Sequence, residues 1–247
     1  MMLRVCGLSF AYDKESVLEN VSFEYDKSDF LALVGPNGGG KSTLLKLILG
    51  LLKPTSGSVE LSSHEIGYVP QNTMPNGEFP ISVLDAALMG RLKNNRFGFY
   101  KKDDKKKALD ALEKVGMREY AHKKIGELSI GQRQKVFIAR ALICEAKLLI
   151  LDEPTASVDM QGQIQIYNIL KSLNSTKGII AVSHDMDVVL GYATKIAYVS
   201  RTLFMHEPSA LTKEAFFEKL QSKGMHNCPV DVFMANTCLH DRPHKDS

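Results

Sequence analysis

Residues 35–43 read Gly35-Pro36-Asn37-Gly38-Gly39-Gly40-Lys41-Ser42-Thr43, which matches the pattern G-x-x-x-x-G-K-[ST] of a phosphate-binding loop in full. The apolar run at 30–34 predicts a buried strand before the loop, and residues 43–49 predict a helix that ends at Gly50. This order of strand, loop and helix is the context that the motif requires. We expect the backbone amides and the helix N-terminus to bind phosphate, Lys41 to reach the outer phosphates, and the Ser42 hydroxyl to ligate Mg²⁺.

The composition is that of an ordinary globular protein. A chain of 247 residues is long enough for one large α/β domain, or for a core with a small inserted lobe. Charged residues interrupt the most apolar stretch, 136–151, and the N-terminus has no signal-peptide block, so we expect a cytosolic protein. A formal charge of +3 does not indicate a nucleic-acid surface, and four scattered cysteines do not indicate a secreted disulfide framework.

The segment before the phosphate loop predicts a small sheet. Residues 3–8 and 22–25 are typical of short strands, with turn residues around Asp13. Tyr12 in this segment can stack on adenine, and Val17 can pack against the same ring or the ribose. Both could equally be ordinary sheet residues.

A further strand is predicted at 66–69 and ends at Pro70-Gln71. A side-chain amide at the end of a core strand can touch both Mg²⁺ and an attacking water, whereas a lone glutamine after proline is otherwise a loop residue. From 72 to 125 the pattern becomes helical without a strand signal, which predicts an inserted helical lobe. The lysine cluster at 101–107 lacks aromatic residues and favours a solvated helix start over an anionic partner.

Two later segments carry groups suited to phosphate chemistry. Ser129 with Gln132 forms a capping-box pattern, which predicts a helix start that can be a second anion site. An apolar strand at 148–151 ends in Asp152 and Glu153, which could hold Mg²⁺ and activate a water, or could simply begin a turn. His184 follows another buried strand at 178–183, where it could bind a γ-phosphate or be structural.

The C-terminal tail is the least informative part of the sequence. An amphipathic helix is predicted at 213–223, after which clear periodicity is lost. The tail holds ligands that could form a tetrahedral Zn²⁺ site, but their spacing matches no standard zinc module: His226, Cys228, Cys238, His240 and His244. A tail with incidental ligands is the alternative.

Taken in chain order, these motifs resemble those of the nucleotide-binding subunit of an ATP-binding cassette (ABC) transporter over about residues 3–215. The motifs are the phosphate loop, Gln71, Leu128–Gln132, Asp152-Glu153, Asp159 and His184. The resemblance implies a RecA-like α/β P-loop core at 1–71 and 126–215, with an N-terminal antiparallel β subdomain. It implies a helical subdomain at 72–125 and a C-terminal helix and tail at 216–247.

The resemblance also implies the roles of individual residues. ATP would be bound by Tyr12, Gly35, Pro36, Asn37, Gly38, Gly39, Gly40, Lys41, Ser42, Thr43 and Asp159, and Mg²⁺ by Ser42, Gln71 and Asp152. Glu153 would be the catalytic base, Gln71 the γ-phosphate sensor and His184 the switch. In a head-to-tail homodimer, Ser129, Gly131 and Gln132 would close over ATP bound to the partner. One departure is Ile130, where the commonest family pentad has glycine, and we expect little loss of function from it.

Within the family the chain is similar to the ATPase subunits of bacterial zinc and manganese importers. The similar features are the triple glycine at 38–40, Ile130, the segment 156–159, and His184-Asp185-Met186. This implies an ATPase at the inner face of the membrane, attached to permease subunits and served indirectly by a substrate-binding protein. The alternatives are an importer for haem, siderophore or cobalamin, a soluble cassette ATPase without a permease, or a regulator that does not hydrolyse ATP; the presence of Glu153 and His184 disfavours the last.

Overall fold

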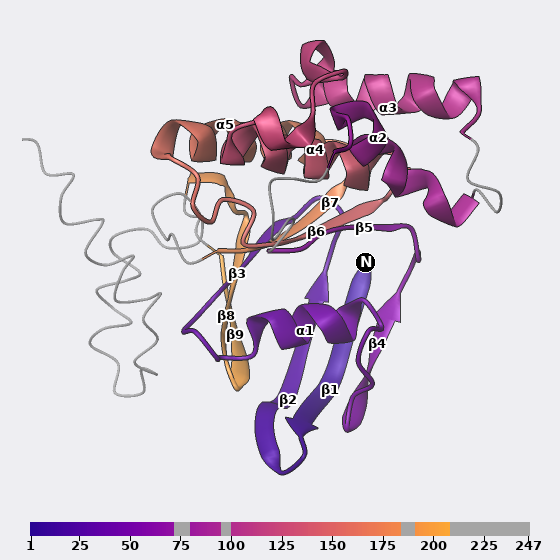
Figure 1. The fold of residues 1–247 in the computed structure, drawn as a ribbon. Coiled ribbons are helices and arrows are strands. Elements are labelled where there is room, and N and C mark those ends of the chain that lie inside the picture. Colours follow the sequence, from indigo (N-terminus) through magenta and orange to yellow (C-terminus); the bar gives the residue numbers. More distant parts are fainter. Residues whose placement is uncertain (72–79, 95–99, 184–190, 208–247) are drawn as a thin grey trace, which may run out of the picture.

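The computed structural model describes residues 1–71, 80–94, 100–183 and 191–207. Its first part is an antiparallel sheet with the strand order β2-β1-β4 (Figure 1). The strands are β1 (Leu3–Tyr12), β2 (Glu15–Tyr25) and β4 (Ser56–Leu61). The two N-terminal strands are longer than predicted, because Asp13 adopts a left-handed φ of 50° that closes a tight hairpin directly after Tyr12.

A second sheet forms the centre of the molecule, with the order β5-β6-β7-β3-β8-β9. Five strands are parallel: β3 (Phe30–Val34), β5 (Ile66–Val69), β6 (Leu148–Asp152), β7 (Gly178–Val182) and β8 (Lys195–Ser200). Every residue of β3, β6 and β7 is buried, which explains their continuous apolar sequences. Because parallel strands end at one edge, the residues that follow β3, β5 and β6 meet there.

Strand β8 is not the edge of the central sheet. It is followed by β9 (Thr202–His206), which pairs with β8 in the antiparallel direction and forms the edge of the sheet. Arg201 makes the tight connection with a left-handed φ of 60°. Nothing in the sequence of this segment marks the turn, because arginine is not a typical turn residue.

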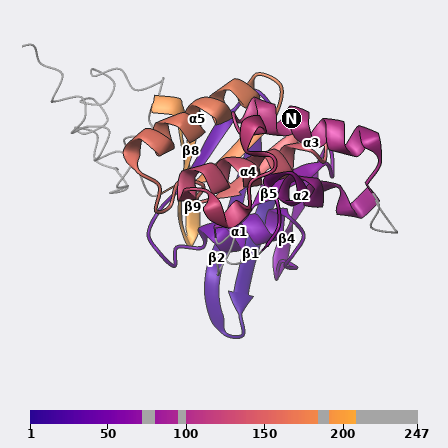
Figure 2. The ribbon, with the colours of Figure 1, turned by 45° about the horizontal axis from the view of Figure 1, so that its top comes forward.

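Helices cover both faces of the parallel sheet. Helix α1 (Lys41–Ile48) lies between the two sheets, where its leucines join the apolar side chains of β1, β2 and β3 in one hydrophobic cluster (Figure 1). The opposite face is covered by α2 (Val83–Leu88), α3 (Lys102–Lys114), α4 (Ile130–Leu142) and α5 (Met160–Asn174) (Figure 2). This arrangement confirms the predicted α/β fold with an antiparallel β layer and a group of helices.

The helices of the predicted lobe pack directly on α4. Along the chain from α2 to α4, three short 3-10 helices accompany α3: η1 (Met89–Asn94), η2 (Arg118–Tyr120) and η3 (Ile125–Glu127). A Cβ on Gly90 would be 2.1 Å from the Arg140 carbonyl oxygen, so this glycine lets η1 lie against α4. Lys101, Lys102, Lys105 and Lys106 are exposed at the start of α3, as expected of a solvated helix start. No helix among the described ranges is long and apolar enough to cross a membrane.

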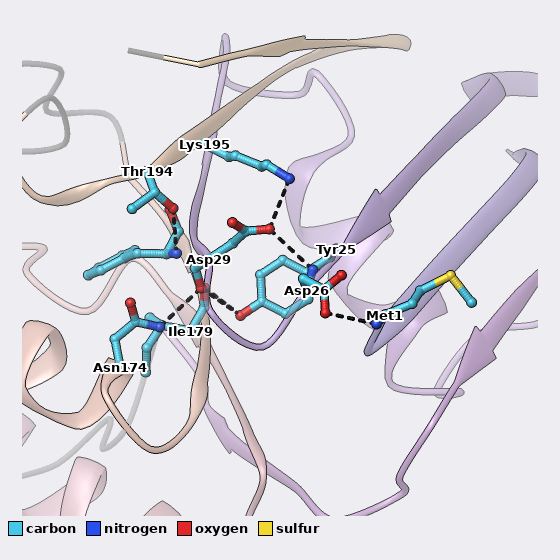
Figure 3. Close-up of polar contacts among 9 residues, drawn as sticks. Met1, Tyr25, Asp26, Asp29, Asn174, Ile179, Thr194 and Lys195 are labelled. Atoms are coloured by element: carbon cyan, nitrogen blue, oxygen red, sulfur yellow. Dashed lines mark hydrogen bonds and ion pairs between the residues drawn. The ribbon is translucent and has the colours of Figure 1, made fainter. Parts of the chain in front are cut away.

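A polar network joins the two sheets at the edge where the parallel strands β3, β7 and β8 begin (Figure 3). The buried Tyr25 hydroxyl donates to the carbonyl oxygens of Asp29, at 3.0 Å, and Ile179, at 3.2 Å. Asn174 also donates to the Asp29 carbonyl, at 3.1 Å, and Lys195 pairs with the Asp29 carboxylate at 3.0 Å. Burial raises the pKa of Tyr25, so its hydroxyl stays protonated and able to donate.

Replacing Tyr25 by phenylalanine is expected to lower the free energy of unfolding by about 1 kcal/mol, since it removes a hydrogen bond but leaves the ring in place. Urea denaturation measures the change. Tyr198→Phe is the matched control, because the partly buried Tyr198 makes no hydroxyl hydrogen bond among the described residues, and its stability should match the wild type. Equal stability of Tyr25→Phe and the wild type would contradict this role of the network.

Candidate nucleotide-binding site

The phosphate loop occupies the turn between β3 and α1, at the edge where the parallel strands end. Its glycines are required by close backbone contacts. A Cβ on Gly35 would be 2.1 Å from the Val199 carbonyl oxygen, and one on Gly39 would be 2.7 Å from the same atom. Gly35, Gly38 and Gly40 have φ values of 141°, 76° and 100°, which side chains rarely adopt. The loop therefore depends on β8 for its support.

Lys41 is the first residue of α1 and its side chain folds back over the loop. The ammonium donates hydrogen bonds of 2.9 Å to the carbonyl oxygens of Gly35 and Pro36. Only 6% of the residue is exposed. Burial lowers the pKa of Lys41, and the nearby carboxylates of Glu153 and Asp152 oppose that shift. An anion bound in the loop would favour the charged ammonium further.

Ser42 and Asp152 bring two oxygen donors together beside the loop. The Ser42 hydroxyl donates to Asp152 Oδ1 over 3.2 Å, although 110 residues separate them in the sequence. Burial raises the pKa of the Asp152 carboxyl, and the hydrogen bond from Ser42 partly offsets this. A carboxylate and a hydroxyl are hard oxygen ligands that suit Mg²⁺, so this pair fits the predicted ion.

Gln71 and Glu153 form a second polar pair at the same edge. Gln71 Nε2 donates to Glu153 Oε2 at 2.7 Å, which joins the end of β5 to the end of β6. Glu153 adopts a left-handed φ of 50°, a conformation that costs energy in a non-glycine residue and recurs at functional sites. Both side chains line a cavity of about 540 Å³ with residues of the phosphate loop and α1: Asn37, Gly38, Gly40, Lys41, Ser42 and Thr43.

A second cavity, of about 570 Å³, lies between the starts of α4 and α5. Ser129 is the N-cap of α4, and the predicted capping box is present: Ser129 Oγ accepts from Gln132 N at 3.2 Å, and Gln132 Oε1 accepts from Ser129 N at 3.0 Å. Asp159 is the N-cap of α5, with Oδ1 accepting from Gly162 N at 2.8 Å. Both helix starts line this cavity, as does Gly131.

The two cavities share no lining residue among the parts of the chain that are described. The candidate residues thus divide into a phosphate-loop group and a Ser129 group that also contains Asp159. Ile130, the departure from the commonest pentad, is 47% exposed at the rim of the second cavity. Its side chain does not enter the buried core.

Tyr12 lies at the end of β1 and is 47% exposed. Its ring packs edge-on against Phe10, with centroids 4.8 Å apart. Phe10 pairs with Leu18, whose Cδ2 would be 2.7 Å from a Cβ on Gly40, so this end of the hairpin supports the phosphate loop. Tyr12 does not itself line either cavity. His184 and the metal-ligand candidates of the tail, Cys228 among them, fall outside the described residues.

The sequence interpretation missed several residues that line the second cavity. Lys135, Gln165 and Gly162 lie there with Ser129 and Asp159. Their spacing could have indicated this, because Ser129, Gln132 and Lys135 recur every three residues on one helix face, as do Asp159, Gly162 and Gln165. What the spacing does not give is that the two faces belong to adjacent helices.

Comparison with known proteins gives one consistent family. Residues 18–156 match the ABC transporter family. The zinc uptake system ATP-binding protein ZurA of Listeria innocua is 41% identical over 217 residues, which cover 82% of this chain and 84% of that protein. The manganese transport system ATP-binding protein MntB of Halalkalibacterium halodurans is 37% identical over 220 residues, covering 85% and 87%.

Solved structures show the same similarity. A chain from the inward-facing conformation of an ABC transporter described as metal-chelate type matches with a TM-score of 0.79 and 36% identity, covering 86% of both chains. A dimeric, post-hydrolysis ATP-binding cassette bound to ADP and phosphate matches with a TM-score of 0.70 and 26% identity. The match covers 84% of this chain and 99% of that one.

Proposed function

The chain belongs to the ABC transporter family, and from this we propose that it is the ATPase subunit that powers an importer of zinc or manganese ions. The observation that carries the proposal is the cavity in which Lys41 and Ser42 of the phosphate loop face the Gln71–Glu153 pair. The names of the zinc and manganese relatives support the ion. The catalytic residues do not bind the transported ion in this proposal, so the identity of the ion is inferred from the similarity to those relatives alone.

The polar side chains at this edge of the sheet divide the tasks of hydrolysis among them. Lys41 and the loop amides bind the outer phosphates of ATP. Glu153 accepts the proton of a water whose oxygen attacks the γ-phosphorus, while the bond from that phosphorus to the bridging oxygen breaks and leaves ADP. Gln71 holds the Glu153 carboxylate in place through its hydrogen bond of 2.7 Å. Ser42 and Asp152 would hold Mg²⁺, which when bound neutralises charge on the phosphate oxygens.

The second cavity supports a head-to-tail homodimer. Helix N-termini attract anions, and the Ser129 cavity contains two of them, yet it shares no described residue with the phosphate loop of its own chain. We assign it to the γ-phosphate of ATP bound by a second copy, and the similar cassette that is dimeric with ADP and phosphate bound supports the dimer itself. His184 is assigned, as the switch, to the γ-phosphate of the ATP bound in the phosphate loop of its own chain, and Tyr12 to the adenine of that ATP.

Closure of the dimer would move the helices around α2 and α3 and so drive a permease at the inner face of the membrane. The permease is a separate integral-membrane subunit in this proposal, supplied with ions by a substrate-binding protein. In the sequence, Gln71 follows β5 and α2 is the next helix, so we assign this covalent connection the task of passing dimer closure from the catalytic cavity to the helical lobe.

The test is the ATPase activity of the chain reconstituted with candidate integral-membrane permease subunits and a substrate-binding protein. We expect a binding protein loaded with Zn²⁺ or Mn²⁺ to stimulate hydrolysis several-fold over the same protein without metal, because the loaded form favours dimer closure. The ion that stimulates is the cargo. An equal rate of hydrolysis with the metal-free protein and with either loaded form would contradict metal import. Failure to assemble with any membrane subunit would indicate a soluble cassette ATPase.

A further inference from the structure

Helices α4 and α5 present matching rows of residues to the Ser129 cavity. On α4 the row is Ser129, Gln132 and Lys135, and on α5 it is Asp159, Gly162 and Gln165. In each row the first residue is the N-cap and the others follow at intervals of three, so both rows run from the helix start along one face. The cavity is therefore shaped by how α4 and α5 are held side by side.

A direct hydrogen bond, exposed to solvent, joins the last residues of the two rows. Lys135 Nζ donates to Gln165 Oε1 at 2.6 Å. The ammonium is partly buried, and burial lowers the pKa of Lys135. In the described part of the chain no carboxylate forms an ion pair with Lys135, so its main polar contact is the neutral amide of Gln165. This hydrogen bond has a charged donor, which makes it stronger than one between neutral groups.

The connecting loop before α5 is held by the same two helices. Val158 is 8% exposed and lies beside two glycines: a Cβ on Gly162 would be 2.6 Å from its Cγ1, and one on Gly131 would be 3.2 Å from that atom. Ser157, just before it, has a left-handed φ of 63°. Any change in the spacing of α4 and α5 would therefore also shift this loop and the N-cap Asp159.

We propose that Lys135 is a positioning residue, whose hydrogen bond to Gln165 clasps α4 to α5 so that Ser129 and Asp159 meet the nucleotide of a second copy as one preformed surface. The proposal rests on the function proposed above. Lys135 acts through Gln165 and not by touching the nucleotide. The clasp favours ATP-driven dimerisation because the two helix starts need not be ordered when the dimer closes.

The experiment measures ATP-driven dimerisation of the full chain by analytical ultracentrifugation, in the Glu153→Gln background that prevents turnover. We expect Lys135→Met to weaken dimerisation about fivefold to twentyfold, and Gln165→Leu to weaken it similarly. The double variant should be no worse than either single variant, because both remove the same contact. Lys135→Arg should retain most of the affinity, since arginine can also donate to Gln165.

Two measurements distinguish a positioning role of Lys135 from a general loss of folding or of nucleotide binding. ATP binding to the monomer, by equilibrium dialysis, should be unchanged in all these variants, since the phosphate-loop cavity does not contain Lys135 or Gln165. Lys105→Met on the exposed face of α3 is the control for loss of a lysine and should dimerise like its parent. If Lys135→Met fails to fold, Lys135→Arg and Gln165→Leu still test the clasp.

Three outcomes would contradict the proposal. The first is that Lys135→Met dimerises as well as its Glu153→Gln parent, and the second is that the double variant shows additive effects. The third outcome is a strong effect of Lys135→Met with none of Gln165→Leu. The last would mean that Lys135 contacts the nucleotide directly. If the Glu153→Gln parent itself forms no dimer with ATP, the proposed function fails, which is distinct from failure of the clasp alone.

Discussion

Glu153→Gln is expected to lower steady-state ATP hydrolysis by about 10³-fold, the size of effect that a general base contributes. The introduced amide has nearly the same shape, and its oxygen can still accept the hydrogen bond that Gln71 Nε2 now donates to Glu153 at 2.7 Å. What the amide lacks is a group that can take a proton from water. ATP binding should therefore remain intact, and ATP should hold the protein as a dimer. Phosphate release and size-exclusion chromatography with ATP measure the two effects.

Glu119→Gln provides the matched control for this change. Glu119 is exposed in η2 and lines neither cavity, so its amide variant should hydrolyse ATP at the wild-type rate. Near wild-type turnover by Glu153→Gln would remove Glu153 from the role of base. In that case the base would have to be another group at the same edge of the sheet.

Local features of the fold could be predicted from the sequence because short segments determine them. The phosphate loop lies between a buried strand and a helix because residues 30–34 are all apolar and the glycines that follow can adopt the positive φ values of the turn. Ser129 caps α4 through its own third residue, Gln132, which is a contact within one turn of helix. Such features involve residues close in the sequence, so a pattern is enough to predict them.

The pairing of distant residues could not be predicted in the same way. Gln71 and Glu153 are 82 residues apart, and their contact exists because β5 and β6 are neighbours in the sheet. A sequence places each residue at a strand end but does not give the strand order. The same is true of Lys135 and Gln165, whose contact depends on α4 lying beside α5. The family resemblance implied that Gln71 and Glu153 act at one site, whereas the contact between Lys135 and Gln165 is visible only in the three-dimensional structure.

Lys41→Met is expected to weaken ATP binding about tenfold to a hundredfold, because it removes hydrogen bonds from a charged donor to the phosphates. The ammonium is 6% exposed and its described polar contacts are the carbonyl oxygens of Gly35 and Pro36, at 2.9 Å each, so the side chain is already held over the loop. Hydrolysis should fall more than binding, by a further 10²-fold or so at saturating ATP, since the lost charge also stabilises the developing negative charge of the transition state. Isothermal titration with ATP and phosphate release measure the two losses.

Methionine keeps most of the volume of the lysine side chain, so the variant separates the loss of charge from the loss of packing. Burial of an ammonium costs free energy, and its removal offsets the loss of the two carbonyl contacts; the thermal midpoint should therefore change little. Lys53→Met, at an exposed position beyond the end of α1, should bind and hydrolyse ATP normally. Wild-type ATP affinity in Lys41→Met would contradict the assignment of this loop to the phosphates. A loss of binding together with a large fall in the thermal midpoint would instead show that Lys41 holds the loop through Gly35 and Pro36.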